Sequence, residues 1–296
     1  MVYSFTYAFR DKLYQMKELS PNKFPHRLRE ITDPPKKLYG EGVLPPEDHK
    51  WLAVVGSRKY TNYGKEACEK LIEGLRGYPI VIVSGLALGI DALAHRAALD
   101  AKLSCVAVPG SGLDPKVLYP STNRRLADEI LRTGGALLSE FEPDFRATAW
   151  GFLQRNRIMA GLCDAVLVIE AEQRSGSLVT SRFATEYNRD VFTVPGSIFS
   201  SSSAGPHMLI KLGATPITSP KELLDALGFK TEEKVKRDYS DCTIEEKKVI
   251  DLLQSPRSRD ALFDALYMPV GQANAILSML ELKGHIQESA GEIHLT

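Results

Sequence analysis

The sequence predicts an α/β fold: a Rossmann-like, doubly wound and mostly parallel sheet, followed by a small C-terminal winged-helix domain. Two observations lead to this prediction. Short apolar runs alternate with helix-length segments over residues 51–218, and residues 240–296 show three helical segments followed by a hairpin pattern. We therefore expect four parts: an N-terminal extension (1–50), the Rossmann-like domain (51–218), a linker (219–239) and the winged-helix domain (240–296).

Six runs within the Rossmann-like domain are short and apolar on both faces. They are WLAVVG, PIVIVSG, SCVAVPG, GALLSE, AVLVIEA and VFTVPG. Continuously apolar strands separated by helices are typical of a parallel sheet that is covered on both faces. The intervening segments, such as 63–75 and 90–99, are each long enough for one helix, which favours a doubly wound sheet.

The C-terminal part reads as a separate small domain. Residues 230–238, KTEEKVKRD, carry charge without apolar periodicity, which is typical of a solvated linker. Beyond them, Thr243 followed three residues later by Glu246 predicts a capping box at a helix start. A second helix is expected to start near Ser258 and a third to follow Pro269. The alternating stretch around the final Ala-Gly predicts a hairpin, which completes a winged helix.

Composition excludes several classes of protein. The chain carries 37 Lys and Arg against 37 Asp and Glu, so only the distribution of charge can indicate a partner. No run approaches the roughly 18 apolar residues of a membrane helix, and the N-terminus lacks the features of a secretory signal. The four cysteines form no C-x-x-C pair, so neither a metal site nor a disulfide is expected. These features predict a cytoplasmic protein without membrane contact.

Loops rich in glycine and serine follow five of the predicted strands. They are Gly56-Ser57-Arg58, Ser84-Gly85 running to Gly89-Ile90-Asp91, Pro109-Gly110-Ser111-Gly112, Ser175-Gly176-Ser177 and Pro195-Gly196-Ser197. One such turn is most often only a tight turn, whereas five at the carboxyl ends of one sheet favour a phosphate ligand. Neither G-x-G-x-x-G nor G-x-x-x-x-G-K-[ST] is present, so no dinucleotide, ATP or other cofactor is expected.

A second candidate site combines arginines with aromatic rings at the start of a predicted helix. Its residues are Phe152, Arg155, Asn156 and Arg157, with Arg146 and Trp150 just before them and Arg174 further along. This combination suits single-stranded nucleic acid, because bases stack on rings while guanidinium groups follow the phosphates. The alternative is an ordinary exposed basic helix start with a core phenylalanine.

These segments together resemble the DprA family. The matching strings are VVGSRKYTNYG, SGLALGIDALAHRAAL, VAVPGSGLDPKVLYPSTNRRL, LLSEFEP, FLQRNRIMAGL, VIEAEQRSGSLVTSRFA and VFTVPGS, and the end of the chain is similar to that family's winged helix. The resemblance implies a cytosolic homodimer that binds and protects incoming single-stranded DNA and helps to load a RecA-type recombinase on it in natural transformation.

The resemblance also implies roles for individual residues. Gly56, Ser57, Arg58, Gly85 and Gly110 would shape the loops, with Ser57 and Arg58 holding phosphate. Phe152, Arg155, Asn156 and Arg157 would border the path of the strand. Arg174, Ser175, Gly176 and Ser177 would supply donors opposite, and Arg146 is the nearest basic counterpart of a lysine that contacts DNA in some members. Asp91 and His95 are expected to be architectural.

Two other functions stay open at this point. A phosphoribohydrolase-like enzyme would use Glu170, Glu186 or Asp91 beside the Ser175–Ser177 loop, but its dense P-G-G-x-G-T pattern is missing, so no catalytic residues are expected. A transcription factor would read duplex DNA through the winged helix. Residues 240–296 carry five Lys or Arg against nine Asp or Glu, a net charge of −4, which argues against duplex binding and favours a protein contact.

Overall fold

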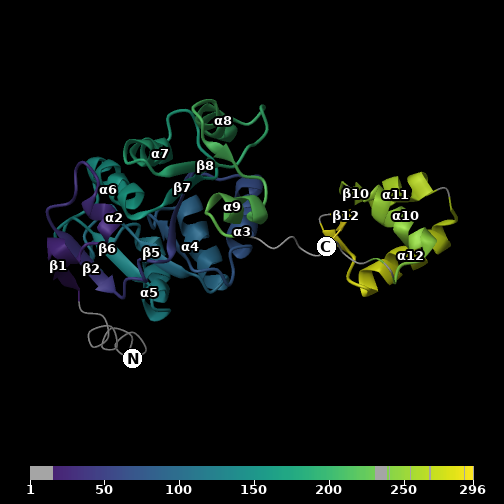
Figure 1. Cartoon of the computed structure of the whole chain (residues 1–296), viewed down its shortest axis with the longest axis horizontal. Helices are drawn as coiled ribbons and strands as arrows, with labels where there is room; N and C mark the ends of the chain where they lie inside the picture. Colours follow the sequence, from purple (N-terminus) through teal and green to yellow (C-terminus); the bar gives the residue numbers. More distant parts are fainter. Residues whose placement is uncertain are drawn as a thin grey trace. The chain divides into compact units, whose positions relative to one another are not determined.

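The computed structural model describes residues 16–230, 239, 241–253, 255–266, 268–289 and 291–295. Contacts divide the chain into two units, which separate between residues 231 and 232. Among the described residues, the larger unit holds a nine-stranded sheet and the smaller a three-stranded sheet (Figure 1). The predicted fold class, a mostly parallel α/β sheet with a C-terminal winged helix, is confirmed.

The large sheet has the order β1-β2-β6-β5-β4-β3-β7-β8-β9. Its strands are β1 (Lys17–Leu19), β2 (Leu38–Gly42), β3 (Lys50–Val55), β4 (Ile80–Ser84), β5 (Ser104–Ala107), β6 (Ala136–Ser139), β7 (Ala165–Val168), β8 (Asp190–Thr193) and β9 (Thr215–Pro216). The strands from β3 onward pair in parallel, and β1 and β2 pair antiparallel. All six predicted strands are present. The chain moves outward from β3 to β6 and then returns to β7 beside β3, which makes the β3–β7 junction a topological switch point.

Helices cover both faces of this sheet. They are α2 (His26–Arg29), α3 (Asn62–Glu73), α4 (Ile90–Asp100), α5 (Arg124–Arg132), α6 (Ala149–Leu162), α7 (Ser177–Glu186), α8 (Ala204–Lys211) and α9 (Pro220–Ala226). Alternate residues of β3 enter different cores. Leu52 and Val54 pack with residues of α3, α4, α5 and α9, whereas Ala53 and Val55 pack with residues of α2, α6 and α7. The strands are therefore apolar on both sides, as a doubly wound sheet requires.

The N-terminal segment differs from the separate extension that we expected for residues 1–50. Its described part, from residue 16, supplies β1 and β2 to the edge of the sheet, and α2 packs against α6. Leu28 and Leu38 are fully buried in one of the two cores. Strands and a helix this short show no clear periodicity, so the sequence pattern did not reveal them.

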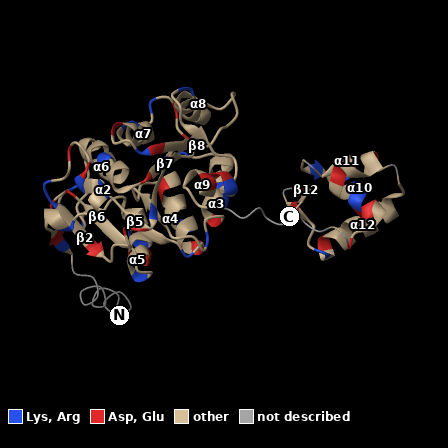
Figure 2. Cartoon of the chain, viewed as in Figure 1, with Lys and Arg blue, Asp and Glu red and all other residues tan. Residues whose placement is uncertain are grey.

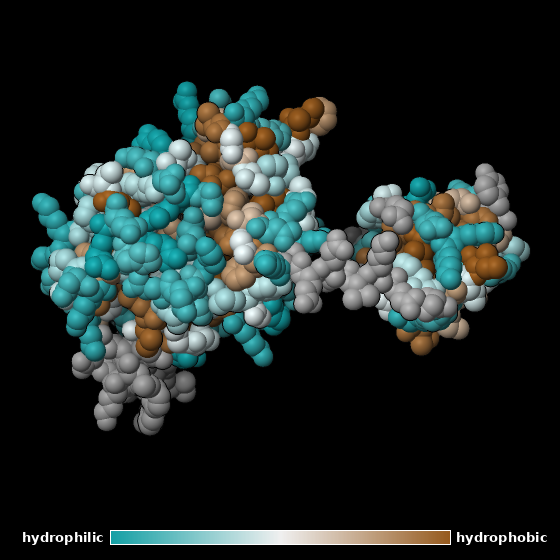
Figure 3. All heavy atoms as spheres, viewed as in Figure 1, coloured by the Kyte–Doolittle hydropathy of each residue, from teal (hydrophilic) through white to brown (hydrophobic). Residues whose placement is uncertain are grey.

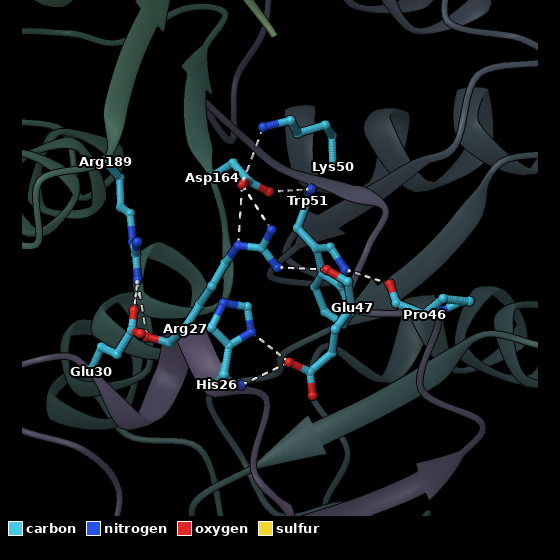
Figure 4. A network of polar contacts seen from close by, with 9 residues as sticks. All are labelled: His26, Arg27, Glu30, Pro46, Glu47, Lys50, Trp51, Asp164 and Arg189. Atoms are coloured by element: carbon cyan, nitrogen blue, oxygen red, sulfur yellow. Dashed lines mark hydrogen bonds and ion pairs between the residues drawn. The ribbon is translucent and has the colours of Figure 1, made fainter. Parts of the chain in front are cut away.

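A polar network fastens the same segment to the start of β7 (Figure 4). Asp164, directly before β7, accepts hydrogen bonds from the Arg27 guanidinium (3.1 Å to Nε and 2.9 Å to Nη2) and from the Trp51 amide (2.8 Å). Arg27 also donates to the Glu47 carbonyl (3.0 Å). The Arg27 and Asp164 side chains are both largely buried, so removing either one would leave the other as an uncompensated charge. The ion pair thus joins the N-terminal segment to the residue before β7.

The end of the large unit also differs from the expected boundary at residue 218. Ser219 caps α9 by accepting from the Glu222 amide (3.3 Å), and Leu223 and Leu224 are buried in the core beside α3. The unit therefore extends through α9. Residues 231–238, which formed most of the charged run, lie outside the described residues.

The smaller unit is a compact winged helix. Its elements are α10 (Ile244–Leu252), β10 (Arg257–Ser258), α11 (Arg259–Leu266), α12 (Val270–Leu282), β11 (Ile286–Ser289) and β12 (Glu292–Leu295). The predicted capping box of Thr243 and Glu246 is confirmed. Val249, Leu262 and Leu277 are among the side chains that form its core. Across both units, none of the described helices combines the length and the apolar character needed to cross a membrane.

Candidate nucleic-acid interface

A pocket of about 770 Å³ opens at the carboxyl ends of β3 and β7, at the switch point of the sheet. Three segments form its walls: the loop after β3 (56–59), one side of α6, and the loop that leads into α7 (172–177). Ligands of doubly wound sheets bind at this place, because the loops of strands that diverge there leave a crevice between them.

Ten of the fourteen predicted site residues line this pocket. They are Gly56, Ser57, Arg58, Phe152, Arg155, Asn156, Arg174, Ser175, Gly176 and Ser177. The remaining four, Gly85, Gly110, Arg146 and Arg157, lie outside its lining. The fold therefore brings the loop after β3 together with α6 and the loop that leads into α7, which follow it by about a hundred residues in the sequence.

Arg58 and Phe152 form one part of the pocket wall together. The Arg58 guanidinium carbon lies 5.0 Å from the centre of the Phe152 ring, and the ring of Tyr119 lies 5.6 Å from that of Phe152. The loop that carries Arg58 is fixed by Ser57, whose hydroxyl accepts from the Lys59 amide (3.0 Å) and donates to the Lys59 carbonyl (2.7 Å). Arg58 itself is exposed, so its charge is free to meet an anion at the pocket mouth.

Gly110 acts on the pocket through Phe152. A β-carbon at residue 110 would clash with the Phe152 ring, so only glycine lets the ring lie in its observed place. The ring is half-buried: part of it packs on Gly110 and Tyr119, and part lines the pocket. Phe152 therefore has features of both a core phenylalanine and a binding residue, since its side chain contributes to packing and is also accessible from the pocket.

A buried charge pair forms the floor. Arg155 is only 4% exposed, donates to the Val108 carbonyl, and lies so close to Gly85 that a β-carbon there would clash with its guanidinium. Burial lowers the pKa of Arg155 to about 10, while the nearby Asp91 carboxylate opposes that shift. Asp91 accepts from the Gly85 amide (3.1 Å), and burial raises its pKa while Arg155 lowers it. Asp91 therefore holds the loop after β4, as expected, and also lines the pocket.

Hydroxyl groups and amides at the start of α7 form a further wall of the pocket. The Ser175 and Ser177 hydroxyls lie 2.7 Å apart, and the Asn156 amide donates to the Gly176 carbonyl (3.2 Å), which links α6 to this loop. Thr180, one turn into α7, is fully buried, lines the pocket and has no hydrogen-bond partner for its hydroxyl within the described structure. Donors at a helix N-terminus, with an unsatisfied hydroxyl beside them, suit an anionic or polar ligand.

Arg157 does not reach the pocket, which differs from our expectation. It is 5% exposed, forms an ion pair with Glu140, and donates to the Asp33 carbonyl (2.7 Å). Residues two apart on a helix point to nearly opposite sides, so Arg155 and Arg157 cannot both face one pocket. Burial raises the pKa of Glu140 to about 7, although Arg157 lowers it. Arg157 is thus a structural residue that joins α6 to β6 and to the N-terminal segment.

The remaining predicted residues have other surroundings. Arg146 is exposed in the loop before α6 and stays a prediction. His95 is fully buried, and burial lowers its pKa to about 4, so it is neutral at pH 7 and architectural. Sequence reasoning missed Lys59, Glu172 and Thr180, which also line the pocket. Thr180 could have been found from its spacing, because it lies one helical turn after Ser177.

One group of side chains could hold a metal ion. Among the described residues, ligand atoms of Asp241, Cys242 and His285 in the smaller unit all lie within 4.8 Å of one another. They already contact one another, since His285 Nε2 is 3.3 Å from an Asp241 carboxylate oxygen and the Cys242 thiol is 3.6 Å from it. Lys283 also donates to the Asp241 carbonyl (2.8 Å), so a cation would meet a positive charge there.

Comparison with known proteins gives consistent matches over both units. The family model of DNA recombination-mediator protein A matches residues 15–228, and that of the DprA winged helix domain matches residues 237–292. The chain is 46% identical over 206 residues to Protein Smf of Escherichia coli K12, covering 70% of this chain and 54% of Smf. It is also 46% identical over 206 residues to DNA processing protein DprA of Streptococcus pneumoniae R6, covering 70% of this chain and 72% of that protein. The chain thus spans about half the length of Smf.

Two solved structures are similar over most of the chain. The X-ray structure of DprA from S. pneumoniae matches with a TM-score of 0.66 and 40% identity, over 77% of this chain and 79% of that one. DprA from Helicobacter pylori, described for its single-stranded DNA binding mode, matches with a TM-score of 0.63 and 32% identity, over 72% of this chain and 96% of that one. This chain belongs to the DNA recombination-mediator protein A (DprA) family.

Proposed function

We propose that this protein binds single-stranded DNA in the pocket at the β3–β7 junction, protects the strand, and helps to load a RecA-type recombinase on it. One observation carries the proposal: the Arg58–Phe152 pair and the hydroxyl groups of Ser175 and Ser177 line the same pocket. A cation, an accessible ring and polar donors within one concave site are what an unpaired nucleotide needs for its phosphate and its base.

The geometry favours a single strand over a duplex. Bases in a duplex are paired and stacked on each other, so their faces cannot reach a ring inside a pocket, whereas an unpaired base can turn toward it. Arg58 would pair with a backbone phosphate, and the donors at the start of α7 would meet a second polar group of the strand. The DprA structure from H. pylori, described for single-stranded DNA binding, supports this assignment.

Binding across a salt series tests the proposal. Affinity for a labelled single-stranded oligonucleotide should fall with salt at a log–log slope of about −0.7 for each phosphate neutralised. Arg58→Ala should weaken binding and make that slope shallower by about 0.7, the contribution of one phosphate contact. Arg132→Ala removes an exposed arginine on α5, outside the pocket lining, and serves as the matched control. Binding that is insensitive to salt, or equal losses in both variants, would contradict the proposal.

We propose a binding role without catalysis. The acids considered for a phosphoribohydrolase either hold loops in place through hydrogen bonds or lie outside the pocket lining. Glu170 accepts from the Thr61 amide (2.9 Å), the Thr61 hydroxyl (2.6 Å) and the Ser202 hydroxyl (3.0 Å), and so holds two loops together. Asp91 holds the loop after β4, and Glu186 is exposed at the end of α7, away from the pocket lining.

Surface features support protein partners. Ile198, Phe199 and Leu212 are 80%, 94% and 76% exposed in the larger unit, and Figure 3 shows apolar atoms at the surface around α8. We propose that this apolar surface serves homodimer contact in the cytoplasm. Charges of both signs are interspersed over the winged helix (Figure 2), and Met279 and Leu282 of α12 are exposed, which supports a protein contact there. Light scattering tests the dimer by comparing the molar mass of Leu212→Glu with that of the wild-type protein.

A further inference from the structure

Trp150 is an exposed aromatic side chain that the proposed pocket does not use. It lies in the first turn of α6 and is 60% exposed, whereas the other tryptophan of the chain, Trp51, is 1% exposed. Exposed apolar side chains that adjoin one another at the edge of a pocket can mark a binding surface, and Trp150 has such a neighbour in Leu153. Any role of this ring toward DNA rests on the proposed binding of single-stranded DNA in the pocket.

The position of Trp150 is at the rim of the pocket. Its chain neighbour Ala149 lines the pocket, and so does Leu153, which is 48% exposed. Residues three apart on a helix are neighbours on its surface, so Trp150 lies directly beside Leu153. The indole is therefore continuous with the pocket wall, although it is not itself part of the lining.

The indole is supported from one side by two further rings. The Phe141 ring meets it at 5.9 Å in an edge-on arrangement, and the Phe145 ring stacks on Phe141 at 4.4 Å. Phe141 is only 7% exposed, so this support is anchored in the larger unit. An aromatic ring that is already held in place loses little conformational freedom when another planar group stacks on it.

The rim and the pocket present two rings in different directions. Trp150 and Phe152 are two residues apart on α6, so their side chains point about 200° apart around the helix axis. Phe152 faces the Gly110 loop and the pocket, whereas Trp150 faces the segment that follows β6. A strand that leaves the pocket past Leu153 would meet the indole next. Arg146, exposed in the same segment, offers a cation for its phosphate.

We propose that Trp150 is a second base-stacking residue, which holds a base adjacent to the nucleotides in the pocket. The same exposed ring could instead meet a protein partner. Continuity with the pocket wall and the nearby arginine favour a nucleic-acid base, because both match the chemistry of a strand that passes over the rim. The proposal extends the contact with DNA from the β3–β7 junction toward the end of β6.

Tryptophan fluorescence of the full chain tests this directly. A base that stacks on an indole quenches its emission, and Trp51 is buried in β3 beyond the reach of the strand. Saturating oligothymidylate should therefore quench wild-type emission, and the quenching should disappear in Trp150→Phe. Trp150→Ala should weaken binding of the oligonucleotide, measured by anisotropy of a label, by roughly 5- to 150-fold, the range for one stacked base. Trp150→Phe should keep most of the affinity.

An abasic oligonucleotide separates stacking from a structural effect. Wild-type protein should lose affinity when bases are removed from the strand, and Trp150→Ala should lose distinctly less, because one stacking contact is already missing. Val43→Ala, which alters another exposed apolar side chain (65%) outside the pocket lining, should bind like wild type. Tight binding without any quenching, or equal losses on abasic strands in both proteins, would overturn the role of Trp150 and leave the pocket intact. Absence of binding by the wild-type protein would instead overturn the proposed function.

Discussion

Phe152→Ala should weaken binding of single-stranded DNA by about 2–3 kcal/mol, roughly 30- to 150-fold. The size of this loss follows from the contacts of the ring. Part of the ring is covered by Gly110 and Tyr119, so the accessible part can stack one base, for which the range is about 1–3 kcal/mol. The guanidinium carbon of Arg58 also lies 5.0 Å from the centre of the Phe152 ring. A cation–π contact of this kind at an exposed site contributes about 0.5–1 kcal/mol.

The assay compares anisotropy of a labelled oligothymidylate with thermal unfolding of the same proteins. Phe152→Ala should lower the melting temperature only modestly, because the ring is half-buried and faces an open pocket. A double-mutant cycle with Arg58→Ala should give losses that do not add, with a coupling of about 0.5–1 kcal/mol. A sharp fall in melting temperature with unchanged affinity would contradict the binding role of Phe152, which would then be a core residue alone.

Three further results are expected. Gly85→Ala should lower both the melting temperature and the affinity for single strands, because the new β-carbon displaces Arg155 from the pocket floor. Unchanged values of both would contradict the close approach of Arg155 to Gly85. Glu140 has a folded pKa raised by burial to about 7 from 4.5, so its contribution to stability is present below about pH 4.5 and is lost as pH rises through about 7. Glu140→Gln should therefore flatten the decline in the free energy of unfolding over that range, measured by urea titration, and an unchanged pH profile would count against it. Truncation after Asp238 should leave single-strand affinity within a few-fold, and residues 240–296 alone should not bind duplex DNA near physiological salt; a loss of a hundredfold, or a specific duplex complex, would contradict the protein-contact role.

The sheet could be predicted from the sequence because its strands are buried on both faces. Runs such as those ending at Val55 and Val168 are apolar at every position, and glycine or acidic residues mark their ends. The edge strands β1 and β2 could not be found in this way. They are short, and β2 joins the sheet by pairing with β6, where Tyr39 lies opposite the distant residue Ser139. Contacts over such distances leave no local pattern.

The site was predictable in part for the same reason. Loops that follow strands of a parallel sheet meet at one edge, so Ser57 and Ser175 could be expected in one pocket. The direction of the arginines on α6 could not be read from the pattern. Every residue from Arg155 to Leu162 is buried, so the helix shows no polar side that would distinguish the floor residue Arg155 from the structural residue Arg157.

Comparing the binding of single-stranded and duplex DNA tests most directly whether the pocket holds unpaired nucleotides. Purified full-length protein is titrated with a labelled oligonucleotide and, in parallel, with the same sequence as a duplex of equal length, at one fixed salt concentration near physiological. The pocket predicts clearly tighter binding of the single strand, and this preference should shrink in Phe152→Ala. Equal affinity for both forms, or tighter binding of the duplex, would contradict the assignment of the pocket to unpaired nucleotides.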